Sequence, residues 1–85
     1  MSYFEYVFIG DLTPLFEEKT AFVLSQINEG TALYRIDKYT DEVVAEDKKR
    51  RTMILTSPVN VWNVLYPIFK DTNIITLGFF KQRII

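Results

Sequence analysis

The chain contains neither cysteine nor histidine, and only three glycines and three prolines occur among its 85 residues. Without Cys and His the usual zinc, iron and copper sites cannot form, and thiol, Ser-His and Cys-His chemistry is excluded. The adjacent carboxylates do not resemble an acid/base couple, because none is placed to be desolvated. We therefore expect a non-enzymatic protein with no catalytic residues, no metal and no cofactor. The absence of disulfides fits a cytoplasmic location.

Long apolar runs and a strong charge imbalance are missing as well. No stretch of about 18 apolar residues is present, so we expect no membrane span. Free-standing nucleic-acid binders are usually basic, whereas this chain has a net charge of −1, which favours protein partners. With 48% hydrophobic residues in a short chain, we expect residues 1–85 to form one small α+β domain.

The first half of the chain predicts a strand followed by a helix. Residues 2–10 are rich in aromatic and β-branched types, as strands are. Thr13 and Pro14 are typical of an N-cap and a first helical residue, and Gly30 is typical of the position after a helix. The helical spacing places one apolar stripe on the buried side, made of Phe16, Thr20, Val23 and Ile27.

The second half contains two ambiguous regions. Strands are expected at 31–39 and 50–56, and the charged stretch between them is read as a loop, with a hairpin that includes Val43–Ala45 as the alternative. Ser57 and Pro58 predict a helix over 58–66, which Pro67 should end or kink. The alternative is an edge strand over 64–69 that turns at 70–73. The last strand is expected at 74–80.

The order strand, helix, strand, strand, helix, strand predicts a ferredoxin-like βαββαβ fold. Its four-stranded antiparallel sheet carries two helices on one face and leaves the other face open. The alternative is a single helix on a longer antiparallel meander, in which residues 64–80 form a hairpin.

Apolar residues on both sides of the strands indicate a surface that meets a partner. Strand side chains alternate between faces, so the first strand has Phe4, Tyr6 and Phe8 on one side and Tyr3, Val7 and Ile9 on the other. A small sheet needs one apolar face for its core, and a second one usually contacts another molecule. The expected interaction face on the open side consists of Phe4, Tyr6, Phe8, Ile74 and Phe80.

The hexamer Val7–Leu12 resembles the RNP2 signature of RNA-recognition-motif domains. This resemblance implies that Phe8 stacks on a base from the open face, while Val7 and Ile9 point into the core. The third strand, Arg50–Thr56, lacks the glycine and aromatics of RNP1, so the resemblance is confined to the hexamer.

These patterns lead to one functional hypothesis and two alternatives. The favoured one is a protein–protein interaction module, a small regulator, adaptor or inhibitor, that uses the open face for a homodimer or another protein. The first alternative is single-stranded nucleic-acid binding, with stacking on Phe8 and Tyr6 and phosphate contacts from the basic run. The second is a small-ligand sensor. The basic run, which also suits an acidic partner, consists of Lys48, Lys49, Arg50 and Arg51. Local pairing with Glu46 and Asp47 is the simpler interpretation of this run.

Overall fold

The computed structural model describes residues 3–30, 33–70 and 79–85, without the side chain of Phe79. These residues form strands and helices in the order β1, α1, β2, β3, α2, β4. Their bounds are Phe4–Asp11 for β1, Pro14–Asn28 for α1, Arg35–Ala45 for β2, Lys48–Ser57 for β3, Trp62–Phe69 for α2 and Phe79–Ile84 for β4.

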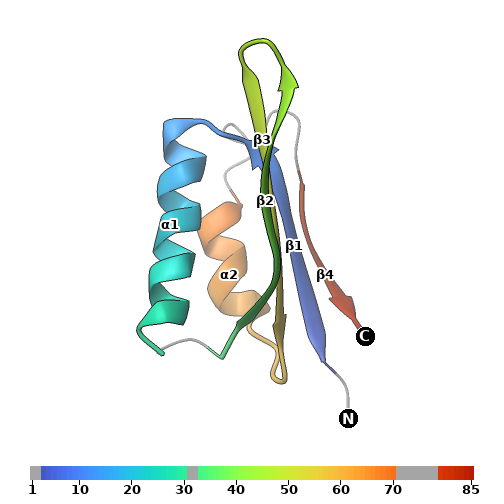
Figure 1. The fold of residues 1–85 in the computed structure, drawn as a ribbon. Coiled ribbons are helices and arrows are strands. Elements are labelled where there is room, and N and C mark those ends of the chain that lie inside the picture. The colour runs from blue at the N-terminus through green and yellow to red at the C-terminus, as the bar shows by residue number, and fades with distance from the viewer. Residues whose placement is uncertain (1–2, 31–32, 71–78) are drawn as a thin grey trace.

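The four strands pair antiparallel in the order β2-β3-β1-β4, with both helices on one face (Figure 1). This is the ferredoxin-like βαββαβ arrangement, so the predicted fold class is confirmed. The alternative meander is wrong, because α2 occupies part of the segment that it assigns to a hairpin. The last strand begins later than predicted; residues 71–78, which include the first five of the predicted strand, lie outside the described residues.

Helix α1 forms as its sequence predicts. The Thr13 side chain accepts a hydrogen bond from the Phe16 N–H at 3.3 Å, which satisfies one free donor of the first turn. Gly30 has a φ of 71°, a left-handed conformation that glycine adopts without steric cost. Phe16, Thr20 and Val23 of the predicted stripe are buried, and Ile27 is half-buried against the same core.

Helix α2 begins at Trp62, four residues beyond the predicted start at Pro58. Ser57 still belongs to β3, where it pairs with Phe4, and its Oγ accepts the Val59 N–H at 3.2 Å. The helix start is instead supported by Asn60, whose Oδ1 accepts the Trp62 N–H at 2.9 Å. Serine followed by proline here ends a strand and closes a turn, and does not cap a helix.

Pro67 lies inside α2, and the helix continues to Phe69. Of the two expectations, that the helix ends or kinks near Tyr66, the first is therefore wrong. Leu65 and Phe69 lie one turn apart and are both buried, so their packing offsets the backbone hydrogen bond that proline cannot make. Asn63, whose carbonyl loses that partner, is on the exposed side of the helix, where water can reach it.

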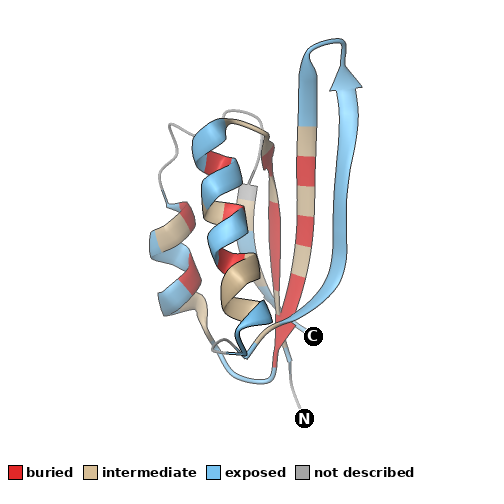
Figure 2. Cartoon of the chain, turned by 60° about the vertical axis from the view of Figure 1, so that its left-hand side comes forward, coloured by how far each residue is buried: buried red, intermediate tan, exposed pale blue. Residues whose placement is uncertain are grey.

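Strands β2 and β3 form a hairpin that projects past the helices (Figure 1), so the favoured loop is wrong and the alternative hairpin is correct. Pairing extends to Ala45 opposite Lys48, which leaves only Glu46 and Asp47 as the turn. Opposite charges face each other across the two arms, an arrangement that stabilises cross-strand pairing. Figure 2 shows that β2 is exposed along its whole length, whereas β3 is buried where helices cover it.

The aromatic row of β1 faces the helices, opposite to the predicted direction. Tyr6 and Phe8 are fully buried in the core cluster, and Phe4 packs against its edge. Phe80 also lies on this side, with its ring centroid 4.7 Å from that of Phe8. The predicted open-face positions of these four residues are wrong, because the space between sheet and helices is filled by the largest side chains available.

Glycine at position 10 explains why α1 packs on this face of β1. Gly10 is buried inside the strand, and a Cβ there would lie 2.8 Å from Cε2 and Cζ of the Phe16 ring. Phe16 is itself 1% exposed, so its ring has little room to move. The close approach of strand and helix therefore requires glycine.

We expect Gly10→Ala to lower the free energy of unfolding by about 1–3 kcal/mol, because the added methyl group overpacks the site. Urea denaturation followed by far-UV circular dichroism measures this change. In the double variant with Phe16→Leu, the two costs should be clearly less than additive, since the shortened side chain relieves the clash. Strictly additive costs would contradict this account.

Candidate functional site

The open face of the sheet carries a small apolar centre in place of the predicted aromatic row. Val7 pairs with Ile54 at its middle, and Ile9 lies next along β1. Val7 is only 8% exposed although no described helix covers it, and Ile9 and Ile54 are partly exposed, so this centre is only partly available to a partner. Charged and hydroxyl side chains surround it, including the ion pair of Glu5 with Arg83 at 2.6 Å. Ile74, the remaining predicted contact, lies outside the described residues.

The basic run is divided between the two faces of the hairpin. Arg51 points to the helix side and is 7% exposed, where its Nε and Nη2 donate to the two carboxylate oxygens of Asp41 at 2.8 and 3.0 Å. Arg50 pairs with Glu42 at 3.2 Å. The predicted pairing with Glu46 and Asp47 is thus wrong for these arginines, which pair with the opposite arm of the hairpin.

Arg51 lies in a small polar cluster at the edge of the helix layer. Its guanidinium carbon is 5.1 Å from the centroid of the Tyr39 ring, a cation–π contact, and its Nη2 is 3.9 Å from Glu17 of α1. The hydrogen bond from Arg51 holds the pKa of Asp41 below its usual range. Arg51 therefore has a structural role, and only Lys48 and Lys49 of the run have no ion pair among those observed in the described residues.

A cleft lined mainly by apolar side chains lies between α1 and α2. Its volume is about 270 Å³. It is lined by Phe22, Val23 and Gln26 of α1, by Leu33 and Tyr34 before β2, and by Val61, Val64, Leu65 and Ile68 in or just before α2. Three of these side chains are more than half exposed: Phe22 at 52%, Leu33 at 61% and Val64 at 59%. No lining residue is charged.

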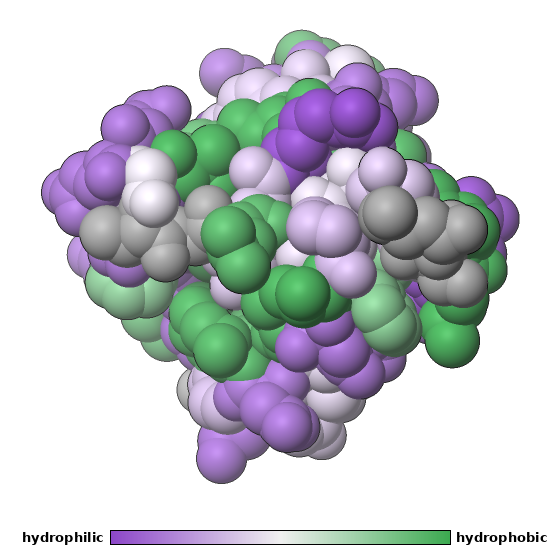
Figure 3. All heavy atoms as spheres, turned by 90° about the horizontal axis from the view of Figure 1, so that it is seen from below, coloured by the Kyte–Doolittle hydropathy of each residue, from purple (hydrophilic) through white to green (hydrophobic). Residues whose placement is uncertain are grey.

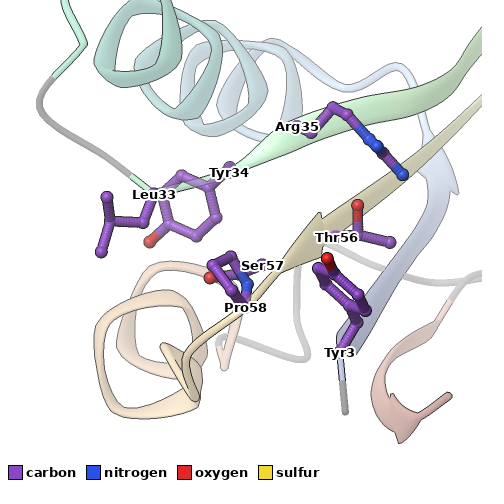
Figure 4. Close-up of a pocket in the computed structure, with 7 residues that line it drawn as sticks. All are labelled: Tyr3, Leu33, Tyr34, Arg35, Thr56, Ser57 and Pro58. Atoms are coloured by element: carbon purple, nitrogen blue, oxygen red, sulfur yellow. The ribbon is translucent and has the colours of Figure 1, made fainter. Parts of the chain in front are cut away.

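A second hollow, of about 370 Å³, continues from this cleft around Leu33 and Tyr34. Figure 4 shows that its walls come from the segment before β1, the start of β2 and the end of β3. Figure 3, which views this end of the molecule from below, shows hydrophobic side chains gathered between hydrophilic ones. We call the cleft and the hollow together the lower apolar surface. Burial raises the pKa of the Tyr34 hydroxyl, so that group stays neutral at physiological pH.

Sequence reasoning did not single out the three most exposed residues of this surface. Phe22 is not a member of the predicted stripe of α1, and Val64 lies in the segment for which helix and edge strand are the alternatives. The available signal is that Phe22 lies off the stripe, where an amphipathic helix normally carries polar residues. Leu33 offers no such signal, because its exposure depends on how the elements around it pack.

Within the described ranges, no group of three or more Asp or Glu residues is placed to hold a metal ion. None of the helices that the structure describes is long and apolar enough to cross a membrane.

Comparison with known proteins supports the fold and adds no family. No protein-family model matches the chain, and no curated protein matches it either. Among solved structures, it is similar to the solution structure of the C-terminal domain of the MgtC protein from Mycobacterium tuberculosis, with a TM-score of 0.54 and 8% sequence identity. The similarity covers 100% of this chain and 86% of that chain. At this identity the likeness concerns the fold alone.

We expect Asp41→Asn to lower the free energy of unfolding by about 1–2 kcal/mol at pH 7, because it leaves the buried Arg51 without its main partner. The pKa of Asp41 is lowered in the folded state. Its contribution is therefore complete above the unfolded pKa and is lost as the pH falls below about 4. Urea denaturation at pH 7 and pH 3 should show a gap between variant and wild type that narrows in acid.

Asp37→Asn is the matched control for this prediction. Asp37 pairs with Arg35, whose side chain is 76% exposed, and exposed pairs contribute well under about 1 kcal/mol. Equal losses from Asp37→Asn and Asp41→Asn would contradict the structural role of Arg51.

Proposed function

We propose that this protein is a non-enzymatic interaction module that binds an apolar segment of another protein on the lower apolar surface. One observation carries the proposal: Phe22, Leu33 and Val64 surround an uncharged cleft, and each is more than half exposed. Contiguous exposed apolar surface of this kind is uncommon on a monomer and is typical of binding sites.

The position of the cleft between two helices supports an elongated occupant. It follows the space between two helices that run antiparallel (Figure 1), which is the arrangement that accepts the apolar face of an amphipathic segment. Because none of its lining residues is charged, the contacting face of the partner should be uncharged as well. Full burial of a large apolar side chain contributes roughly 1.5–3 kcal/mol before the cost of association.

The extent of the surface favours a protein over a small molecule. The apolar lining continues from the cleft into the second hollow through Leu33 and Tyr34. Val59, which is 44% exposed, lies outside both hollows but stands in the chain between Pro58 of the second hollow and Val61 of the cleft. A ligand that fills one hollow would leave this residue in water, whereas a protein segment can cover it together with both hollows.

The test uses peptides selected from a displayed random library against the wild-type domain. We expect the selected peptides to be apolar on one side and to bind Val64→Asp at least about 30-fold more weakly, a loss of about 2 kcal/mol. Isothermal titration calorimetry measures both affinities. Val64 is exposed and lies in the first turn of α2, where a carboxylate is tolerated, so the variant should keep its circular dichroism spectrum.

Asn63→Asp is the matched control, since it adds the same charge to the neighbouring position of α2, and Asn63 does not line the cleft. Binding should survive in this variant. If both variants lose the peptides equally, or if no apolar peptide is selected, the lower apolar surface is not the binding site.

A further inference from the structure

Strand β2 is an uncovered edge of the sheet. It is the first strand in the order β2-β3-β1-β4, and every one of its residues is exposed, on the helix side as well as the open side. Figure 2 shows most of the strand, beyond its start, lying apart from the helices. The outward N–H and C=O groups of such a strand are free to pair with another strand.

Two irregularities divide β2 and leave a regular segment between them. The pairing with β3 shifts register between Ile36 and Lys38 and again between Val43 and Ala45. Bulges of this kind bend a strand and interrupt its edge. The regular part, residues 38–43, is therefore the part of β2 suited to strand pairing, and its centre is next to Thr40.

We propose that β2 pairs antiparallel with β2 of a second copy, about a twofold axis at Thr40. In this register the numbers of two opposite residues add up to 80. Lys38 of one copy therefore faces Glu42 of the partner subunit, and Glu42 of the first copy faces Lys38 of the partner subunit. Both residues lie on the open side, where Lys38 pairs with Ile54 and Glu42 with Arg50 within one copy. The edge is thus complementary in charge to itself.

The neighbouring registers lack this complementarity. If both helix layers stay on the same side of the joined sheet, opposite residue numbers must have an even sum, because side chains alternate between faces. Within residues 38–43, a sum of 82 places Asp41 opposite itself, a sum of 76 places Lys38 opposite itself, and a sum of 78 brings no opposite charges together. Like charges directly opposite each other destabilise a pair of strands.

This dimer leaves the lower apolar surface accessible, since the paired part of β2, residues 38–43, does not line it; of β2, only Arg35 at the start of the strand does. Self-association along β2 is therefore independent of the proposed function, and the two can be tested separately. Asn63→Asp and Val64→Asp should leave the oligomeric state unchanged.

Charge reversal tests the register. We expect Lys38→Glu and Glu42→Lys each to weaken self-association at least tenfold in sedimentation equilibrium, since each puts like charges opposite each other twice. An equimolar mixture of the two variants should dimerise again, because the repelling pairs become attracting ones. The double variant Lys38→Glu/Glu42→Lys should dimerise by itself, which also controls for loss of the Glu42–Arg50 ion pair.

A cross-link tests the axis without relying on charge. The chain has no cysteine, so Thr40→Cys introduces a single thiol that the twofold axis brings opposite its copy. Opposite residues of antiparallel strands have Cα atoms about 4.5–5.5 Å apart, within the range of a disulfide bond. We expect a disulfide-linked dimer under mild oxidation. Thr52→Cys, on the same face but one strand further in, should remain unlinked, because two such residues would be about 14 Å apart.

A wild-type chain that is monomeric at its highest soluble concentration would overturn the proposal. So would a mixture of the two charge variants that does not dimerise, or equal cross-linking at positions 40 and 52. A dimer that resists both charge reversals would show that the copies meet on another surface.

Discussion

The two layers of this protein depend on the stacking of aromatic side chains between them. Phe8 of β1 lies with its ring centroid 4.2 Å from that of Phe69 and 4.7 Å from that of Phe80, so one residue joins β1, α2 and β4. Trp62 extends the stack over Phe80 at 4.6 Å. Aromatic pairs contribute beyond their buried area. The direction of Phe8 therefore decides which face of the sheet the helices cover and which residues are left for partners.

A polar network at the start of α2 complements this stack. The Tyr6 hydroxyl accepts the Val61 N–H at 2.7 Å, and Gln82 of β4 donates to Asn60 at 2.9 Å. The buried Tyr6 hydroxyl thereby finds a partner, as buried polar groups require. The same contacts fix where α2 begins, four residues after the Ser-Pro pair. Placing α2 there exposes Val64 beside α1 and so creates the cleft on which the proposed function rests.

The hairpin is stabilised by a different kind of interaction. Its far end lies beyond the helices, so opposite charges and backbone pairing hold it together with little apolar burial. Arg51 is the exception, because it is buried at the point where the hairpin leaves the helix layer. Strand β2 is therefore long and exposed, and β3 is its one neighbour in the described sheet. The edge proposed for self-association and the lower apolar surface thus lie on different parts of the molecule.

The sequence by itself determined the fold class and the whole of α1, because capping, helical spacing and a terminal glycine all act over a few neighbouring residues. It also determined that one side of β1 is aromatic. It did not determine which side meets the helices, since both sides are apolar and strand alternation has no preferred face. The tertiary structure decided this through the contact of Phe16 with Gly10, which depends on residues of two different elements. The same holds for the cleft and for the burial of Arg51, which arise only where separate elements meet.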